Sequence, residues 1–265
     1  MDKENRVLLY NTLKNAIENE EFLILLQPKF YTKNGDLAGA EALVRWNRNG
    51  RLVMPNIFIP IFERYKLITI LDMYVLEKAC SLLNEWIHKN YKIVPISVNE
   101  SKQNLYNDNH LNDLIGLINK YNVSPSLIEL EMTETTVVYN IDLAKEAEKN
   151  VHRLGFIVSM DDFGTGYSSF SMLKNINIDI LKMDKSFFDD ILESKRGKII
   201  IESIVDMAHK LDTKVVAEGI ETQEQVNYLK SINCDMIQGY YFEKTITIEE
   251  FERKYLEGNN YDRKK

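Results

Sequence analysis

Short apolar runs alternate with amphipathic segments along most of the 265-residue chain. Runs bounded by turn residues are typical of buried strands, and apolar residues three or four positions apart are typical of helices. The expected strands are residues 22–28, 37–46, 92–98, 126–131, 155–160, 179–183, 213–217 and 234–237. The expected helices are residues 2–20, 56–66, 69–89, 141–154, 197–211, 221–232 and 247–256, one ending near residue 121, and a short one after strand 155–160.

This alternation predicts an α/β fold within one domain, and at this length it favours a barrel of parallel strands. An open, doubly wound sheet is the alternative, although no glycine-rich GxGxxG fingerprint indicates a dinucleotide site. The turn residues Asn34, Gly35 and Asp36 separate the first two strands. Since so short a connection joins only antiparallel strands, the first strand is expected to run against the second. No linker interrupts the pattern, so we treat residues 1–265 as a single domain with a core of about 22–256.

Composition excludes several classes of protein. The net charge of -7 argues against a general basic surface for DNA or RNA polymers. Two cysteines imply no disulfide framework and suit a reducing compartment. The charged N-terminus lacks the apolar core of a signal peptide, and no apolar run approaches the ~20 residues of a membrane helix. We therefore expect a cytoplasmic domain with no membrane segment in this chain.

Asp161 and Asp162 directly follow an apolar run. Adjacent carboxylates at such a position repel each other and are costly to desolvate unless a cation binds them. A solvated pair in an ordinary turn is the alternative. Other polar residues stand at or close to the carboxyl ends of the expected strands, which a barrel gathers on one face. The full set is Glu41, Asn99, Glu131, Asp161, Asp162, Lys182, Glu218 and Gln238.

The residue types in this set indicate the kind of metal. All four histidines fall in expected helices or loops, so a zinc or copper cage is not expected. Carboxylates with one amide oxygen suit Mg²⁺ or Mn²⁺. Asp161 and Asp162, with further carboxylates, are suited to two ions, and such a pair favours hydrolysis of a phosphate diester. Lys182 would orient water or neutralise charge in the transition state, or serve as a structural ion pair.

Eight short motifs follow one another in a fixed order along the chain. They are QPK (27–29), EALVRW (41–46), SVN (97–99), EMTE (131–134), DDFGTGYSS (161–169), LKMD (181–184), AEGIE (217–221) and QGYY (238–241). This ordered set resembles the EAL domain, a family of bacterial phosphodiesterases that act on cyclic di-GMP. The resemblance runs from about residue 22 to about residue 242. It implies a (β/α)8 TIM-like barrel with one antiparallel strand. It also implies hydrolysis of cyclic di-GMP to linear pGpG with two bound ions, Mg²⁺ or Mn²⁺.

The resemblance also implies roles for individual residues, by position within the motifs. The metal ligands would be Glu41, Asn99, Glu131, Asp161 and Asp162. The catalytic residues would be Lys182, which contacts the attacking water, Glu218, a general base or partner of the second metal, and Glu221, which supports it. The substrate-binding residues would be Gln27, Arg45 and Gln238, the last completing the set around the metals. Glu134 would brace the loop after Asp162, and residues 168–174 are where a homodimer contact is expected.

Two departures from the family pattern stand out. Glu100 replaces the usual apolar residue after Asn99, and we expect it to point away from the metals. Residues 47–51 form an expected loop that is shorter and more basic than usual, which would alter how the second guanine is held.

Every expected metal position is filled, which favours an active phosphodiesterase. A catalytically silent cyclic di-GMP receptor that controls a partner is the alternative. A Schiff-base lyase with Lys182 as nucleophile is a third hypothesis. The surrounding carboxylates oppose it, because they would raise the pKa of the lysine instead of lowering it.

Overall fold

The computed structural model describes residues 2–107, 109–134, 136, 140–164, 173–189 and 194–257. Within these residues, eight strands close into a ring in the order β1-β9-β8-β7-β6-β5-β4-β2, with β2 pairing back to β1. They are β1 (Phe22–Tyr31), β2 (Leu37–Arg48), β4 (Ile96–Glu100), β5 (Ile128–Thr133), β6 (Ile157–Phe163), β7 (Ile180–Met183), β8 (Lys214–Ala217) and β9 (Met236–Ile237). The barrel prediction is therefore confirmed, and the open sheet is wrong.

Strand β1 runs antiparallel to both of its neighbours, β2 and β9. The other neighbouring pairs in the ring are parallel. The expected turn joins β1 to β2, where Gly35 has a left-handed φ of 73° and the Asp36 N–H donates to Asn34 Oδ1 at 3.1 Å. This hairpin sets Gln27 opposite Glu41. Its geometry explains why one barrel strand runs against the rest.

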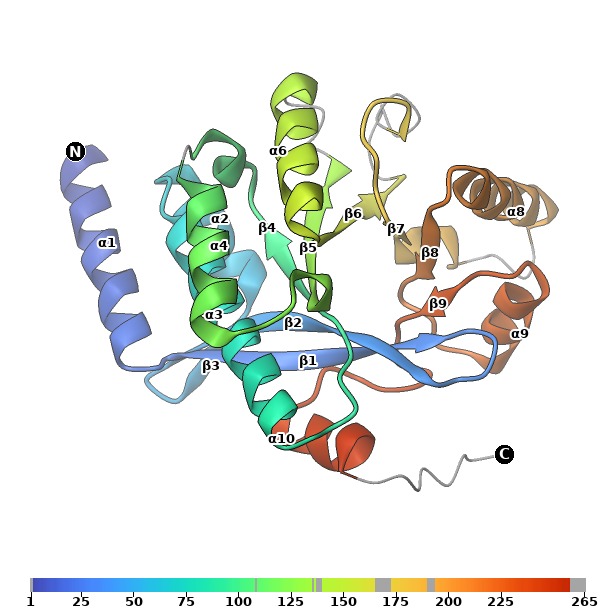
Figure 1. Ribbon diagram of the computed structural model, residues 1–265, viewed down its shortest axis with the longest axis horizontal. Helices are drawn as coiled ribbons and strands as arrows, with labels where there is room; N and C mark the ends of the chain where they lie inside the picture. Colours follow the sequence, from blue (N-terminus) through green and yellow to red (C-terminus); the bar gives the residue numbers. More distant parts are fainter. Residues whose placement is uncertain are drawn as a thin grey trace.

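Helices surround the barrel (Figure 1). Their apolar faces pack on the strands, as in α8, where the buried residues are Ile201, Ile204, Val205 and Ala208. Local signals set their ends: in α6, Asn140 accepts a hydrogen bond from the Leu143 N–H, and Gly155 closes the helix at a φ of 92°. The helices are α1 (Asp2–Glu18), α2 (Pro55–Arg64), α3 (Ile68–His88), α4 (His110–Tyr121), α6 (Ile141–Leu154), α8 (Lys195–Lys210), α9 (Gln223–Ser231) and α10 (Ile248–Phe251). Short 3-10 helices lie at Lys102–Tyr106, Pro125–Leu127 and Lys185–Phe187, and a π-helix lies at Glu252–Leu256.

Some element boundaries differ from those expected. Strand β4 begins only at Ile96, after a proline that has no N–H to donate, and extends to Glu100. Strand β6 continues through Asp161 and Asp162 to Phe163. The prediction of a loop at residues 47–51 is wrong. This segment is the end of a hairpin, in which the chain turns back at Gly50 and β3 (Arg51–Val53) pairs with β2. The short helix expected after β6 falls mostly outside the described residues.

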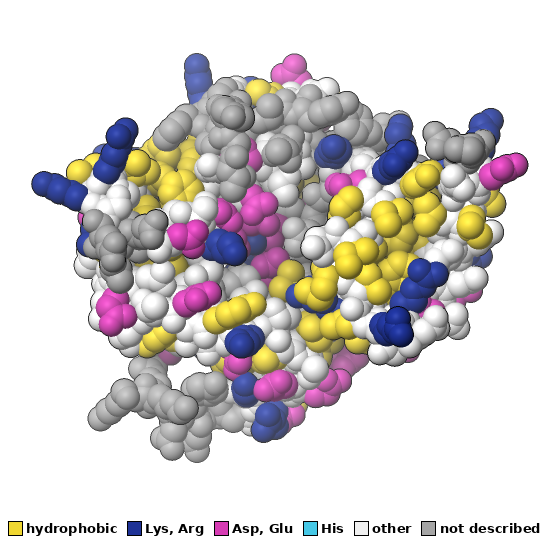
Figure 2. Space-filling model, turned by 180° about the vertical axis from the view of Figure 1, so that it is seen from behind, with side chains coloured by type: hydrophobic (Ala, Val, Ile, Leu, Met, Phe, Trp, Pro, Cys, Tyr) yellow, Lys and Arg dark blue, Asp and Glu magenta, His cyan; other side chains and the backbone are white. Residues whose placement is uncertain are grey.

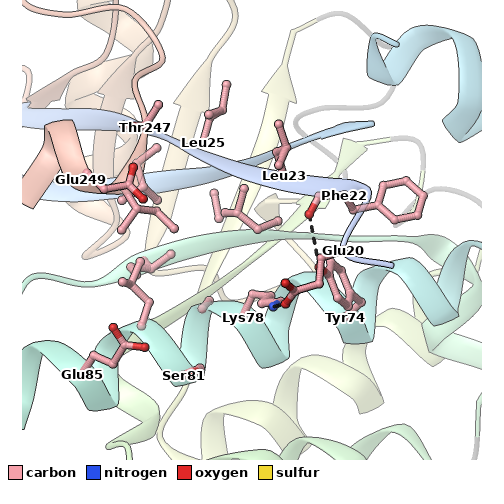
Figure 3. A pocket seen from close by; sticks show the side chains of 17 residues that line it. Glu20, Phe22, Leu23, Leu25, Tyr74, Lys78, Ser81, Glu85, Thr247 and Glu249 are labelled. Atoms are coloured by element: carbon pink, nitrogen blue, oxygen red, sulfur yellow. Dashed lines mark hydrogen bonds and ion pairs between the residues drawn. The ribbon is translucent and has the colours of Figure 1, made fainter. Parts of the chain in front are cut away.

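A pocket of about 490 Å³ lies on the outside of the barrel, between β1, α3 and α10 (Figure 3). Tyr74 at its edge donates a hydrogen bond to the Phe22 carbonyl at 3.2 Å, and Lys78 pairs with Glu20 at 3.0 Å. None of the predicted site residues lines this pocket.

No helix in the described part of the chain is long and apolar enough to cross a membrane.

Candidate active site

A second pocket, of about 310 Å³, opens at the carboxyl ends of the parallel strands, where barrels of this kind carry their chemistry. Figure 2 shows Asp and Glu side chains gathered in a hollow near the middle of one face of the molecule. The predicted residues that line the pocket are Gln27, Glu41, Asp161, Lys182, Glu218, Glu221 and Gln238.

Lys182 lies at the centre of this group, on β7, with 1% of its side chain exposed. Its Nζ lies 2.7 Å from Glu131, 2.9 Å from Asp161, 3.0 Å from Glu218 and 3.6 Å from Glu41, measured to carboxylate oxygens. Burial acts to lower the pKa of Lys182, but the four carboxylates outweigh it and raise that pKa well above its ordinary value. A lysine held in its charged form cannot serve as a Schiff-base nucleophile, so the lyase hypothesis is not supported.

Glu41 and Gln238 together connect β1 to the rest of the site. Its Oε2 accepts a hydrogen bond from Gln238 Nε2 at 2.6 Å, and its Oε1 accepts one from Asn99 Nδ2 at 3.3 Å. The same Gln238 nitrogen lies 3.2 Å from Gln27 Oε1. Burial, followed by the nearby Glu131 carboxylate, raises the pKa of Glu41. The contacts thus bring residues from β1, β2, β4 and the end of β9 into one network.

Asp161, Asp162 and Glu218 each offer a carboxylate oxygen within 4.8 Å of the others. In a regular strand, consecutive side chains point to opposite faces. Here the pairing of β6 with β7 is irregular between Met160 and Phe163, and Asp162 has a left-handed φ of 55°. This local irregularity lets both aspartates approach Glu218.

Two of these carboxylates, Glu218 and Asp162, have raised pKa values. Burial raises the pKa of Glu218 to about 8, with Asp161 adding to the rise and Lys182 opposing it. Partial burial and the adjacent Asp161 raise the pKa of Asp162. The donors in this three-residue cluster are carboxylate oxygens, which hard divalent cations prefer. The site therefore fits a bound divalent cation, which would relieve the repulsion.

Glu134, with 2% of its surface exposed, holds the start of the loop after β6. Its Oε2 accepts a hydrogen bond from the Gly164 N–H at 3.2 Å. Gly164 has a φ of 94°, and a Cβ there would lie 2.3 Å from the Phe187 ring. The position therefore requires glycine on two counts. Residues 165–172 lie outside the described residues, and they include the end of this motif and most of the expected dimer segment.

Two predicted residues lie further from the centre. Glu221 is an exposed residue at the pocket, and its N–H donates to Gln225 Oε1. Arg45 is partly buried and donates to the Val44 carbonyl at 2.9 Å, but it does not belong to the described pocket lining. The structure therefore does not bring Arg45 into the lysine-centred group.

Glu100 points away from that group, as expected. It pairs with His110 Nε2 at 3.1 Å and accepts a hydrogen bond from Asn104 Nδ2 at 2.6 Å. Strand alternation explains this, because neighbouring residues of β4 face opposite sides.

Sequence reasoning missed several residues at or beneath the pocket. Asp184, Lys185 and Tyr240 line it, and each lies within three residues of a predicted residue. Lys29 and Glu129 are buried and belong to the ion-pair network around Glu131. Their spacing in the sequence could have identified them, because Lys29 follows Gln27 by two positions and Glu129 precedes Glu131 by two. Residues spaced in this way share a strand face.

The chain is similar in sequence to known proteins. It is 36% identical to the signaling protein YkoW of Bacillus subtilis, over 92% of this chain and 31% of that protein. It is 35% identical to the cyclic di-GMP phosphodiesterase NbdA of Pseudomonas aeruginosa, over 92% of this chain and 32% of that protein. The chain thus spans about a third of the length of these curated relatives.

Solved structures agree with the sequence comparisons. The PaMucR phosphodiesterase in complex with c-di-GMP superposes with a TM-score of 0.85 at 30% identity, covering 92% of this chain and 99% of that one. An EAL domain protein from Listeria monocytogenes EGD-e gives a TM-score of 0.81 at 31% identity, covering 91% and 95%. The family model of the EAL domain matches residues 10–245. The chain therefore belongs to the EAL domain family.

Proposed function

We propose that this domain hydrolyses cyclic di-GMP to linear pGpG with Mg²⁺ or Mn²⁺ bound. The observation that carries the proposal is the buried Lys182 surrounded by four carboxylates, beside the cluster of Asp161, Asp162 and Glu218. A relative named as a cyclic di-GMP phosphodiesterase, and the similar structure of a c-di-GMP complex, support the choice of substrate.

The proposed metal ligands are Glu41, Asn99, Glu131, Asp161 and Asp162, holding two ions. When bound, such ions supply Lewis-acid stabilisation of the phosphate and a lowered pKa for water. The raised pKa values of Glu41 and Asp162 support this assignment, because carboxylates that repel one another gain most from added positive charge.

Other residues of the chain would act on the substrate directly. The Lys182 ammonium would orient the attacking water and stabilise negative charge on the phosphate. Glu218 would accept a proton from that water, because its carboxylate lines the pocket and lies 3.0 Å from the Lys182 ammonium. Glu221, at the same pocket, would support Glu218.

Polar groups at the pocket would hold the ligand. Gln27 and Gln238 share a hydrogen bond at 3.2 Å and offer amide groups to the substrate. Arg45 would contact a phosphate or guanine group, because a guanidinium can make paired hydrogen bonds with either.

We further propose that Glu134 braces the loop after Asp162 through its hydrogen bond with Gly164. The remaining proposals are a homodimer formed through residues 168–174 and a cytoplasmic location.

Incubation of the purified protein with cyclic di-GMP and Mg²⁺ or Mn²⁺, followed by chromatographic separation of pGpG, tests the proposal. We expect linear pGpG to accumulate. Tight binding of cyclic di-GMP without any turnover would instead support a silent receptor. A protein that neither binds nor hydrolyses cyclic di-GMP would contradict both the phosphodiesterase and the receptor assignment.

A further inference from the structure

Lys29 is a buried cation on β1 that lies directly beneath the pocket. Gln27, two residues earlier on the same strand face, lines the pocket opposite Glu41. Lys29 pairs in register with Gly39, two residues from Glu41 toward the start of β2. At ~3.3 Å per residue, Lys29 therefore lies about 7 Å deeper in the barrel than Gln27. Only 2% of its side chain is exposed.

The Lys29 ammonium contacts two carboxylates of β5, each at 3.0 Å. One is Glu129 Oε1 and the other is Glu131 Oε1. The second oxygen of Glu131, Oε2, lies 2.7 Å from Lys182. Glu131 is thus held by an ammonium group on each oxygen, one from the layer beneath the pocket and one from its centre. This arrangement fixes both the position and the rotation of the carboxylate.

Packing alone does not explain a lysine at this position. Replacing buried ion pairs by apolar residues is often neutral or stabilising, since two charges must otherwise be desolvated. The pairing with Glu129 and Glu131 raises the pKa of Lys29 against the effect of burial, so the group keeps its charge. Burial likewise opposes ionisation of Glu131, but Lys182 and then Lys29 lower the pKa of Glu131 to about 2.

We propose that Lys29 is a positioning residue, which holds Glu131 Oε1 so that Oε2 faces the pocket in the orientation needed for metal binding. This inference rests on the proposed function, in which Glu131 is a metal ligand. Lys29 does not line the pocket, so it acts through Glu131 and not on the substrate. Partners that orient metal ligands in this way typically contribute about 10- to 100-fold to metal affinity or activity.

The test compares two variants, both studied first without cyclic di-GMP. Lys29→Met alone would leave two buried carboxylates without their cation, and the protein could fail to fold. The double variant Lys29→Met/Glu129→Gln removes the lysine together with the extra carboxylate, so the buried charge stays balanced. Glu129→Gln alone is the matched control, because Lys29 can still contact Glu131. Thermal unfolding of the metal-free proteins establishes that both are folded.

Calorimetric titration with Mn²⁺ is the primary measurement. We expect the double variant to bind Mn²⁺ about 10- to 100-fold more weakly than the wild type, and Glu129→Gln to remain within about threefold. With cyclic di-GMP added, kcat should fall in the double variant while KM changes little. Equal Mn²⁺ affinity and equal kcat in the double variant and the control would overturn the inference.

The two proposals fail in different ways. A wild-type protein that binds Mn²⁺ but releases no pGpG would contradict the proposed function, while the Mn²⁺ comparison would still decide the role of Lys29. A wild-type protein that releases pGpG while the double variant matches it in affinity and kcat would contradict only the role of Lys29.

Discussion

Lys182 Nζ lies 2.7 Å from Glu131 Oε2, and the two side chains are 1% and 0% exposed. The pair joins β7 to β5, which are separated in the sheet by β6 alone. Charges buried this deeply are tolerated only when each has a partner. The site and the stability of the barrel therefore depend on the same lysine.

Replacing Lys182 by methionine should destabilise the metal-free protein strongly. The change leaves a cluster of buried carboxylates without their central cation, and breaking a buried ion pair in this way costs about 3–5 kcal/mol. Turnover of cyclic di-GMP should fall by about 100-fold or more, because a charge-stabilising group is lost. Urea unfolding and the pGpG assay measure the two effects.

The control for this variant is Lys210→Met, which removes an exposed ion pair with Asp206. Its unfolding free energy should change by less than about 1 kcal/mol. Equal stability of the two variants would show that Lys182 does not compensate the buried carboxylates.

Glu41→Ala should abolish turnover. The substitution removes a proposed metal ligand and one of the two acceptors of the Gln238 amide, which donates to Glu41 at 2.6 Å and to Gln27 at 3.2 Å. The rate of pGpG release is measured beside Glu85→Ala, a change in the outer pocket at α3 that should leave the rate unaltered. Near-normal activity of Glu41→Ala would remove this residue from the metal site.

Gly164→Ala should destabilise the protein by about 1–3 kcal/mol, because an L-residue is strained at a φ of 94° and the new Cβ would meet the Phe187 ring. Gly116→Ala is the matched control. Nothing lies within 4 Å of a Cβ at this position inside α4, so alanine should stabilise the helix by about 0.5–1 kcal/mol. Chemical denaturation measures the change in unfolding free energy, which should be opposite in sign for the two variants. A Gly164→Ala protein that is more stable than the wild type would contradict the strained turn.

His152 should make stability depend on pH. Its Nε2 lies 2.8 Å from Asp179 Oδ2, and this hydrogen bond is the main cause of the raised pKa of His152, with burial opposing it. A raised folded-state pKa gives stability that is fully present below the unfolded value of about 6.5 and is lost as the pH rises through the folded value.

The measurement is urea unfolding of the wild type and of His152→Gln at a series of pH values. The difference in unfolding free energy between the wild type and His152→Gln should be largest near pH 6 and should shrink as the pH rises. His88→Gln, which changes an exposed histidine, should lack this trend. If that difference stays constant with pH, the ion pair of His152 with Asp179 is not its cause.

Much of the architecture could be predicted from local patterns. The Asn34 to Asp36 turn indicated the antiparallel first strand, and residues 141–154 were predicted as the helix that α6 forms. In both cases the signal lies within a few neighbouring residues, since turn chemistry and helix capping are local. The hairpin that includes β3 was missed because its strand has only three residues.

The site was only partly predictable for the same reason. Strand-end residues were identifiable because a barrel gathers those ends. The contacts of Lys29 with Glu129 and Glu131 join residues 100 and 102 positions apart, and no local sequence pattern predicts them. The left-handed backbone of Asp162 likewise depends on the irregular pairing of β6 with β7, which exists only once the sheet has formed.

The most direct test of the account is the release of pGpG from cyclic di-GMP by the wild-type protein after removal of divalent cations with a chelator. We predict no pGpG from the stripped protein and restored release when Mg²⁺ or Mn²⁺ is added in excess. Release of pGpG at the same rate by the stripped protein would contradict the account. So would a protein that releases no pGpG with Mg²⁺ and none with Mn²⁺.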